Sequence, residues 1–149
     1  MELSVVNYES MLYQQVLDLR QRILRQPLGL NLYDEDLSAD KDQYIVIAHK
    51  EEILQACLMI QIISVDTVKF RQMAVDIAYQ SKGIGSLLMS YAENFCVLND
   101  YVHIFLHARE TAIPFYEKLK YQIEGNEFLE VGIPHVKMRK SIPLSAAPL

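Results

Sequence analysis

The chain has 149 residues, of which 51% are hydrophobic and 22% charged, and its formal net charge is −5. This length suits one domain with a single core, and the composition excludes a disordered chain. The negative charge argues against nonspecific nucleic-acid binding, and no apolar run approaches the roughly 20 residues that a membrane span needs. The N-terminal segment has neither the basic nor the apolar region of a signal peptide, so the sequence predicts a cytoplasmic protein.

The N-terminal segment predicts a strand followed by a helix. LSVV, residues 3–6, is a short run typical of a strand. Residues 10–25 follow, and their apolar side chains recur at helical spacing: Leu12, Val16, Leu19 and Ile23. Ser10 is available as the N-cap of this helix, and Pro27 and Gly29 predict its end.

An acidic segment, residues 33–42, separates this helix from the next strand. It carries five carboxylates, at Asp34, Glu35, Asp36, Asp40 and Asp42. Two interpretations stay open. The segment is either a solvated surface turn or an acidic rim that attracts a cationic substrate.

The remaining elements alternate in a way that indicates one mixed sheet. Strands over residues 44–49, 53–63 and 66–75 are joined by short turns and imply an antiparallel meander. A helix, a buried strand, a second helix and a final hairpin then follow, with the first three at 83–97, 101–108 and 111–120. The crossover of residues 66–108 should be right-handed and place its two strands parallel.

This order predicts an α/β (α+β) fold, with a mixed, mostly antiparallel sheet of about seven strands flanked by three to four helices. A single domain is expected over residues 1–140, and residues 141–149 read as a flexible tail.

Gly83 and Gly85 open the helix that follows the strand ending MAV. A helix N-terminus exposes unpaired N–H groups and about half a positive charge, so bare backbone there suits a phosphate. Gln80 and Lys82 can add side-chain contacts. The alternative is a turn whose glycines allow close packing of helix on sheet. The stretch has neither a P-loop pattern nor the third glycine of the dinucleotide fingerprint.

Two motifs in register resemble the GCN5-related N-acetyltransferase (GNAT) superfamily. Q-x-x-G-x-G, starting at Gln80, resembles its motif A, and LHARETAIPFYEKLKY (106–121) resembles its motif B. The resemblance covers residues 1–140 and implies the GNAT fold and acetyl-CoA as cosubstrate. EFLEVGIPHVKM (127–138) is similar to the ElaA-like branch of the superfamily.

The resemblance also implies which residues bind acetyl-CoA. Met73 and Val75, with Ala74 between them, would serve the pantetheine arm and thioester carbonyl. The pyrophosphate would lie on the loop and helix start, formed by Gln80, Ser81, Lys82, Gly83, Ile84, Gly85 and Ser86. The chain departs from the pattern at Arg109, where motif B often has an asparagine; arginine can reach a phosphate instead. Lys120 replaces the glycine usual at the end of the motif B helix.

Tyr116 falls on the family tyrosine that protonates the departing CoA thiolate. The alternative is a ring packed in the core with its hydroxyl bonded to backbone. Aminolysis needs a neutral amine and therefore a base, for which His135, His107, Glu110 and Asp36 are candidates, beside a water-mediated route. The four histidines lack metal-site spacing, so no metal is expected.

The resemblance thus implies direct transfer of an acetyl group to a primary amine of a small molecule or peptide, since neither Cys57 nor Cys96 stands at a position suited to a covalent intermediate. Both cysteines are expected to be buried thiols. The alternative function is a catalytically silent CoA-binding sensor. The absence of the motif B asparagine supports this alternative. A homodimer is expected by resemblance.

Overall fold

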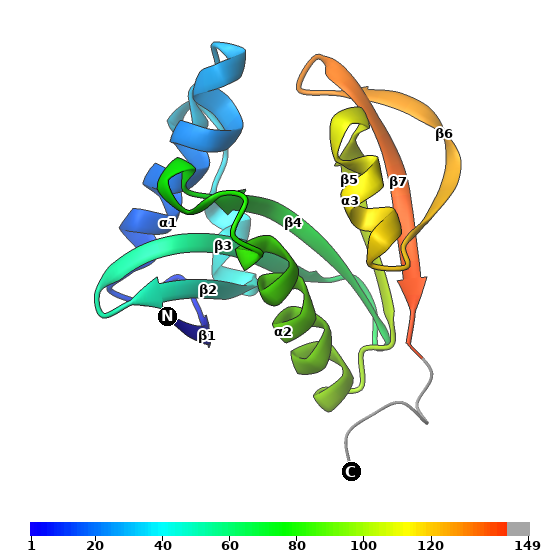
Figure 1. The fold of residues 1–149 in the computed structure, drawn as a ribbon, viewed down its shortest axis with the longest axis horizontal. Coiled ribbons are helices and arrows are strands. Elements are labelled where there is room, and N and C mark those ends of the chain that lie inside the picture. Colours follow the sequence, from blue (N-terminus) through cyan, green and yellow to red (C-terminus); the bar gives the residue numbers. More distant parts are fainter. Residues whose placement is uncertain (143–149) are drawn as a thin grey trace.

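The computed structural model describes residues 1–142 as one seven-stranded sheet with helices on both faces (Figure 1). The strands are β1 (Glu2–Val6), β2 (Tyr44–Lys50), β3 (Ile53–Ile62), β4 (Thr67–Val75), β5 (His103–Arg109), β6 (Gln122–Glu130) and β7 (Ile133–Ser141). The α-helices are α1 (Tyr13–Arg20), α2 (Ile84–Leu98) and α3 (Ile113–Lys118). None of the helices in residues 1–142 is long and apolar enough to cross a membrane.

The sheet topology confirms the predicted fold class. The strand order is β1-β2-β3-β4-β5-β7-β6, and every neighbouring pair is antiparallel except β4 and β5. These two are parallel because α2 carries the chain back between them, as predicted for the crossover of residues 66–108. Strand β7 continues one residue past the predicted boundary at 140, and the N–H of Ile142 donates to the Val102 carbonyl oxygen at 2.8 Å, so the first two residues of the predicted tail are ordered. Residues 143–149 lie outside the described residues.

The predicted helix over residues 10–25 is wrong at its start. Helix α1 begins at Tyr13, and the Ser10 hydroxyl accepts the Leu12 N–H at 3.1 Å in the preceding turn instead of capping the helix. Past Arg20 the chain continues as a π-helical turn and a 3-10 turn. It stops at Gly29, whose φ of 71° is left-handed, so the predicted end is confirmed.

Two hydrophobic cores lie on opposite faces of the sheet. On the face covered by α2, side chains such as Leu58, Leu88 and Met138 are fully buried. On the face covered by α1, the core includes Val16 and Met59. Strand β3 contributes to both cores because its side chains alternate between the faces. Both cysteines are buried free thiols, as predicted.

Strand β4 changes the direction of its alternation at a bulge. Residues 68 and 70 belong to the core under α2, but Met73 and Val75 pack against that same core, so the even–odd pattern reverses between them. Cys57 pairs with Ala74 and Met59 with Arg71, which leaves two residues of β4 opposite one of β3. The bulge includes Gln72, whose φ of 55° is left-handed.

The two parallel strands separate beyond the bulge. Pairing of β4 with β5 runs from Thr67–His103 to Phe70–Leu106, whereas each strand continues for several more residues. Figure 1 shows β4 and β5 together at one end and apart at the other. The C-terminal ends of both strands therefore border an opening in the sheet.

A buried ion pair attaches the acidic segment to α1. The Arg20 Nη1 lies 2.8 Å from the Asp40 Oδ2, and the Tyr13 hydroxyl donates to the same oxygen at 2.7 Å. Arg20 is 2% exposed and Asp40 4%. Asp40 is therefore part of the interior and not of a surface rim.

We expect Asp40→Ala to lower the free energy of unfolding by about 3–5 kcal/mol, because it leaves the buried Arg20 charge without a partner. Asp42→Ala is the matched control, since Asp42 is exposed in the same turn. Urea denaturation of both variants measures the difference. Equal stability of the two would contradict a structural role for the pair.

Candidate active site

The glycine loop is fastened to the end of β4. The Gln80 Nε2 donates to the Val75 carbonyl oxygen at 2.9 Å, and Asp76 accepts the Ala78 N–H at 3.2 Å in the 3-10 turn that precedes it. Gly83 then forms the N-cap of α2 with a φ of 79°. Gln80 therefore holds the loop in shape, a role that the sequence motif did not specify.

The start of α2 presents backbone donors without helical partners. Leu87 N–H is the first to bond within the helix, to the Gly83 carbonyl at 3.1 Å, so the N–H groups of Ile84, Gly85 and Ser86 precede the ladder. No side chain caps the helix. The free donors and the positive end of the helix dipole make this terminus suited to an anion.

The two glycines serve different needs. At Gly83 a Cβ would meet no atom within 4 Å, so the positive φ is what favours glycine there. At Gly85 a Cβ would lie 3.4 Å from the Phe115 ring and 3.7 Å from the Met73 methyl. Gly85 thus lets α2 approach α3 and β4 closely, which agrees with the close-packing interpretation at this position, while the phosphate-binding interpretation stays a prediction.

A cavity of about 510 Å³ lies against this loop, and we call it the glycine-loop cavity. It is lined by Met73, Val75, Tyr79, Gln80, Ser81, Gly83, Ile84, Gly85, Ser86, Ala112, Phe115 and Tyr116, none of which is charged. Most of the residues predicted to bind the cofactor meet here. Ala74 does not line it, because the bulge turns its side chain into the core under α1, and Lys82 is exposed outside it.

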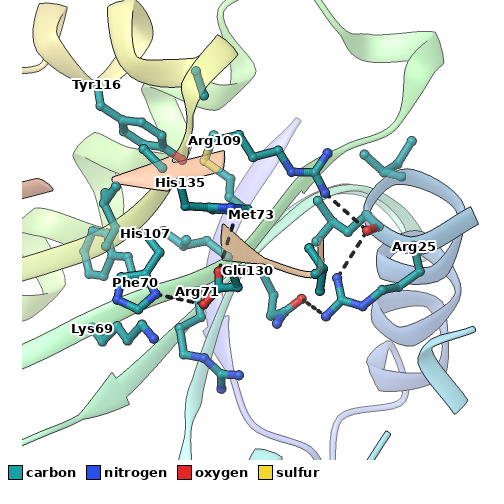
Figure 2. A pocket seen from close by; sticks show the side chains of 18 of the residues that line it. Arg25, Lys69, Phe70, Arg71, Met73, His107, Arg109, Tyr116, Glu130 and His135 are labelled. Carbon is teal, nitrogen blue, oxygen red and sulfur yellow. Dashed lines mark hydrogen bonds and ion pairs between the residues drawn. The ribbon is translucent and has the colours of Figure 1, made fainter. Parts of the chain in front are cut away.

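A second cavity of about 430 Å³ adjoins the first, and we call it the histidine cavity (Figure 2). Its walls come from the π-helical turn after α1, from β4 and β5, and from the β6–β7 hairpin. His107 and His135, two of the predicted base candidates, line it. Met73, Ala112 and Tyr116 line both cavities, so the two spaces meet at these three residues.

Tyr116 lies at this junction and not in the interior of the core. Its ring makes edge contacts with Phe115 and Tyr121, at centroid distances of 5.0 and 6.0 Å. Within residues 1–142 its hydroxyl has no hydrogen-bond partner, which speaks against the alternative of a hydroxyl bonded to backbone. Burial raises the pKa of Tyr116 to about 12, so the phenol stays protonated at ordinary working pH.

Glu130 joins the two histidines. His107 Nδ1–H donates to Glu130 Oε1 at 2.9 Å, and Glu130 Oε2 lies 3.6 Å from His135 Nε2, as the dashed lines of Figure 2 show. The other nitrogen of His135 donates to the Ile133 carbonyl oxygen at 2.9 Å. Phe128 covers the group, stacked on His135 and edge-on to His107. Burial alone would raise the pKa of Glu130, but the hydrogen bond from His107 and the charges of both histidines and Lys69 together lower it.

Sequence reasoning missed Glu130. It is the last residue of β6, and its place beside His135 follows from the hairpin, in which Phe128 pairs with His135 and Glu130 with Ile133. The motif EFLEVGIPH contains the signal, because a tight turn at Val131–Gly132 folds the glutamate back over the histidine.

Three residues occupy positions that do not fit the roles predicted for them. Arg109 lines the histidine cavity, and its Nη2 donates to the Leu24 carbonyl oxygen at 3.2 Å, so it does not reach the glycine loop. Glu110 and Asp36 are exposed and line neither cavity. Their positions do not favour either carboxylate as the base.

The acidic segment does not form a rim of free charge. Only Glu35 of its five carboxylates lines a cavity, and both its oxygens bind Arg25, at 2.6 and 3.1 Å. Arg25 lowers the pKa of Glu35 through this hydrogen bond, against the opposing effect of burial. Asp34, Asp36 and Asp42 are exposed, as the surface-turn interpretation expects.

The lowered pKa of Glu130 predicts a pH-dependent contribution to stability. A carboxylate with a depressed folded pKa stabilises the protein above its ordinary value of 4.5, and this contribution is lost as the pH falls through the lower folded value. The destabilisation caused by Glu130→Gln should therefore be larger at pH 6 than at the lowest pH at which the protein folds. Glu127→Gln, on the exposed part of the same strand, should show no such trend in urea denaturation. A pH-independent difference for Glu130→Gln would argue against the contact with His107.

The chain is similar to acetyltransferases in sequence and in fold. Residues 14–142 match the family model described as an acetyltransferase (GNAT) domain. The uncharacterized protein YyaT of Bacillus subtilis is 37% identical over 76 residues, which are 51% of this chain and 51% of YyaT. The match thus spans about half the length of that curated relative.

Solved structures show the same fold. A putative N-acetyltransferase from Lactobacillus plantarum has a TM-score of 0.82 at 20% identity, covering 95% of this chain and 99% of that one. Escherichia coli ElaA has a TM-score of 0.81 at 22% identity, covering 95% and 100%. A GNAT acetyltransferase from Elizabethkingia anophelis with acetyl-CoA bound has a TM-score of 0.71 at 14% identity, covering 95% and 97%. Because the family model extends over most of the chain, the protein belongs to the GNAT acetyltransferase family, as its glycine loop and FYEK motif predicted.

Proposed function

We propose that the protein transfers an acetyl group from acetyl-CoA directly to a primary amine. The observation that carries this proposal is the meeting of two cavities at Met73, Ala112 and Tyr116. One cavity leads to the free N–H groups of α2, and the other contains the histidines. A thioester and an amine that entered from opposite sides would meet at this junction.

The glycine-loop cavity fits the cosubstrate. Its uncharged walls and the N–H groups of Ile84, Gly85 and Ser86 suit a pyrophosphate that binds through backbone donors. Beyond Phe70, the edge of β4 that faces β5 has no paired strand within residues 1–142, so its backbone can bond the amides of a pantetheine arm. The bound acetyl-CoA of the Elizabethkingia neighbour supports this choice of cosubstrate.

Glu130 would orient the base. In the neutral form of His107, in which Nδ1–H donates to this carboxylate, the lone pair of the ring is on Nε2. That nitrogen can take a proton from the incoming ammonium, directly or through water, which frees the amine to attack. The amine nitrogen then bonds to the thioester carbon, the carbon–sulfur bond breaks, and the sulfur leaves as a thiolate. The new amide nitrogen loses its second proton to solvent.

Tyr116 would stabilise this thiolate without giving up its proton. A thiol has a pKa near 8.5 and the phenol one of about 12, so complete proton transfer would cost roughly 5 kcal/mol. A hydrogen bond to a charged acceptor is worth about 1.5–3 kcal/mol and needs no transfer. The thiolate can then take a proton from solvent.

The alternative of a silent CoA-binding sensor rested on the arginine at position 109. Arg109 lines the histidine cavity and not the glycine-loop cavity, so its presence does not argue for a sensor over an enzyme. The carboxylate that orients His107 instead favours a catalytic site. The expectations of a cytoplasmic location, of no metal requirement and of a homodimer stay predictions.

Gly83→Glu should abolish binding of acetyl-CoA, because a carboxylate at the helix start would repel the pyrophosphate. Gly125→Glu is a matched control, since Gly125 also has a positive φ and open space around its Cβ but lies on β6. Calorimetric titration should give a dissociation constant for the control equal to that of the wild type. Retained binding in Gly83→Glu would overturn the assignment of the glycine loop.

Tyr116→Phe should lower kcat by about 10- to 100-fold, because the hydrogen bond to the developing thiolate is lost. Binding of acetyl-CoA should be unchanged. Release of CoA thiol during acetylation of amines measures the rate, with Tyr91→Phe on the exposed face of α2 as control. An unaltered kcat in Tyr116→Phe would remove the tyrosine from the mechanism.

A further inference from the structure

The histidine cavity is rich in positive charge. Four of its lining residues are cationic, namely Arg25, Lys69, Arg71 and Arg109, and two are acidic, Glu35 and Glu130. The glycine-loop cavity has no charged residue in its lining. The cations are therefore gathered on the side where the acceptor enters and not where the pyrophosphate would bind.

Three of these cations have no carboxylate partner. Arg25 is neutralised by its two bonds to Glu35. Within the described residues, 1–142, Lys69, Arg71 and Arg109 form no ion pair. Arg71 donates only to the Gln43 side-chain oxygen, at 3.3 Å, and Arg109 only to a backbone carbonyl.

These unpaired cations are partly removed from water. Burial is the largest cause that lowers the pKa of each of the three groups. A charge held in this way is costly until an anion approaches it, because the lost hydration is not replaced. An anionic ligand would relieve that cost.

Two of the cations and the junction of the two cavities follow one another along β4. Lys69 and Arg71 precede the bulge and line the histidine cavity, whereas Met73 follows it and reaches both cavities. Adjacent residues of a strand advance about 3.3 Å, so Arg71 lies roughly 7 Å along the chain from the junction. An acceptor of a few carbon atoms can span this separation.

We propose that the acceptor is a small primary amine that also carries an anionic group, a carboxylate or a phosphate, bound by Lys69 and Arg71. This inference rests on the proposed function and specifies its substrate class. The amine end would lie toward Glu130, His107 and the junction. A polycationic amine would instead meet Lys69, Arg71 and Arg109, and its binding would be opposed.

The test compares acceptors that differ only at the end remote from the amine. 4-Aminobutanoate, 1-aminobutane and 1,4-diaminobutane form one matched set, and O-phosphoethanolamine with ethanolamine forms the phosphate pair. Each is titrated calorimetrically into the protein saturated with CoA, at one ionic strength. We expect a carboxylate or a phosphate member to bind about tenfold or more tightly than its neutral counterpart. The two sets distinguish the two kinds of anion.

Variants connect this preference to the cavity. The Lys69→Gln/Arg71→Gln double variant should lose the preference for the anionic members while acetyl-CoA still binds, which shows that it folds. Lys137→Gln is the control. Its ammonium faces the neighbouring Phe105 ring and Glu124 but does not line the cavity, so the preference should persist.

Several results would overturn the inference. They are tighter binding of the neutral or dicationic members, no binding by any member of the panel, or an unchanged preference in the double variant. The proposed function is tested separately by titrating the wild-type protein with acetyl-CoA. Failure of that titration overturns the proposed function, whereas cosubstrate binding without an anion preference overturns only the substrate class.

Discussion

The site depends on the place where β4 stops pairing with β5. Pairing ends at Phe70 and Leu106, and the bulge at Gln72 follows directly. A left-handed φ at a residue other than glycine costs about 1 kcal/mol or more, so the surroundings must hold it. The Cys57 thiol contacts the Gln72 carbonyl oxygen at 3.6 Å, and Arg25 donates to the Gln72 side chain at 3.3 Å. Both contacts come from the α1 side of the sheet, so the wall of the histidine cavity helps to keep the strands apart.

The reversal at the bulge gives the two cavities different chemistry. Before it, β4 directs Lys69 and Arg71 to the histidine cavity; after it, Met73 and Val75 line the glycine-loop cavity. A regular strand would have kept one alternation and could not supply cations to one space and apolar walls to the next in this order. In the glycine-loop cavity an anion is attracted by the N-terminus of α2. In the histidine cavity an anion is attracted by the charged side chains of Lys69 and Arg71.

Local signals in the sequence were sufficient for the fold and for most of the residues that line the glycine-loop cavity. Hydrophobic period, turn residues and the glycine spacing are properties of short segments, and they predicted the strands, α2 and the glycine loop. Glu130 was missed because its contact with His107 joins β6 to β5 across β7, and that register depends on non-local pairing. Arg109 was assigned to the cosubstrate from its place in motif B, whereas the cavity that it lines depends on how β4, β5 and the turn after α1 come together, which is also non-local. At Lys120 the family pattern predicted the backbone correctly although the residue differs. Lys120 adopts the left-handed φ of 74° that the usual glycine would adopt at the end of the motif B helix.

The acidic segment illustrates how composition alone can mislead about a binding site. Its carboxylates allowed either a surface turn or a rim that attracts a cation, yet Asp40 is paired with Arg20 and Glu35 with Arg25, and both arginines come from the helical segment after β1. These pairs hold the segment against that helix and leave its charge neutralised at the cavity wall. Asp34, Asp36 and Asp42 stay exposed, so the segment still adds negative charge to the surface, while Lys69, Arg71 and Arg109 in the lining of the histidine cavity form no ion pair within residues 1–142. Selection of an acceptor is then governed by the local field of Lys69 and Arg71 and not by the charge of the whole protein, because at physiological ionic strength exposed charges more than about 8 Å away are largely screened.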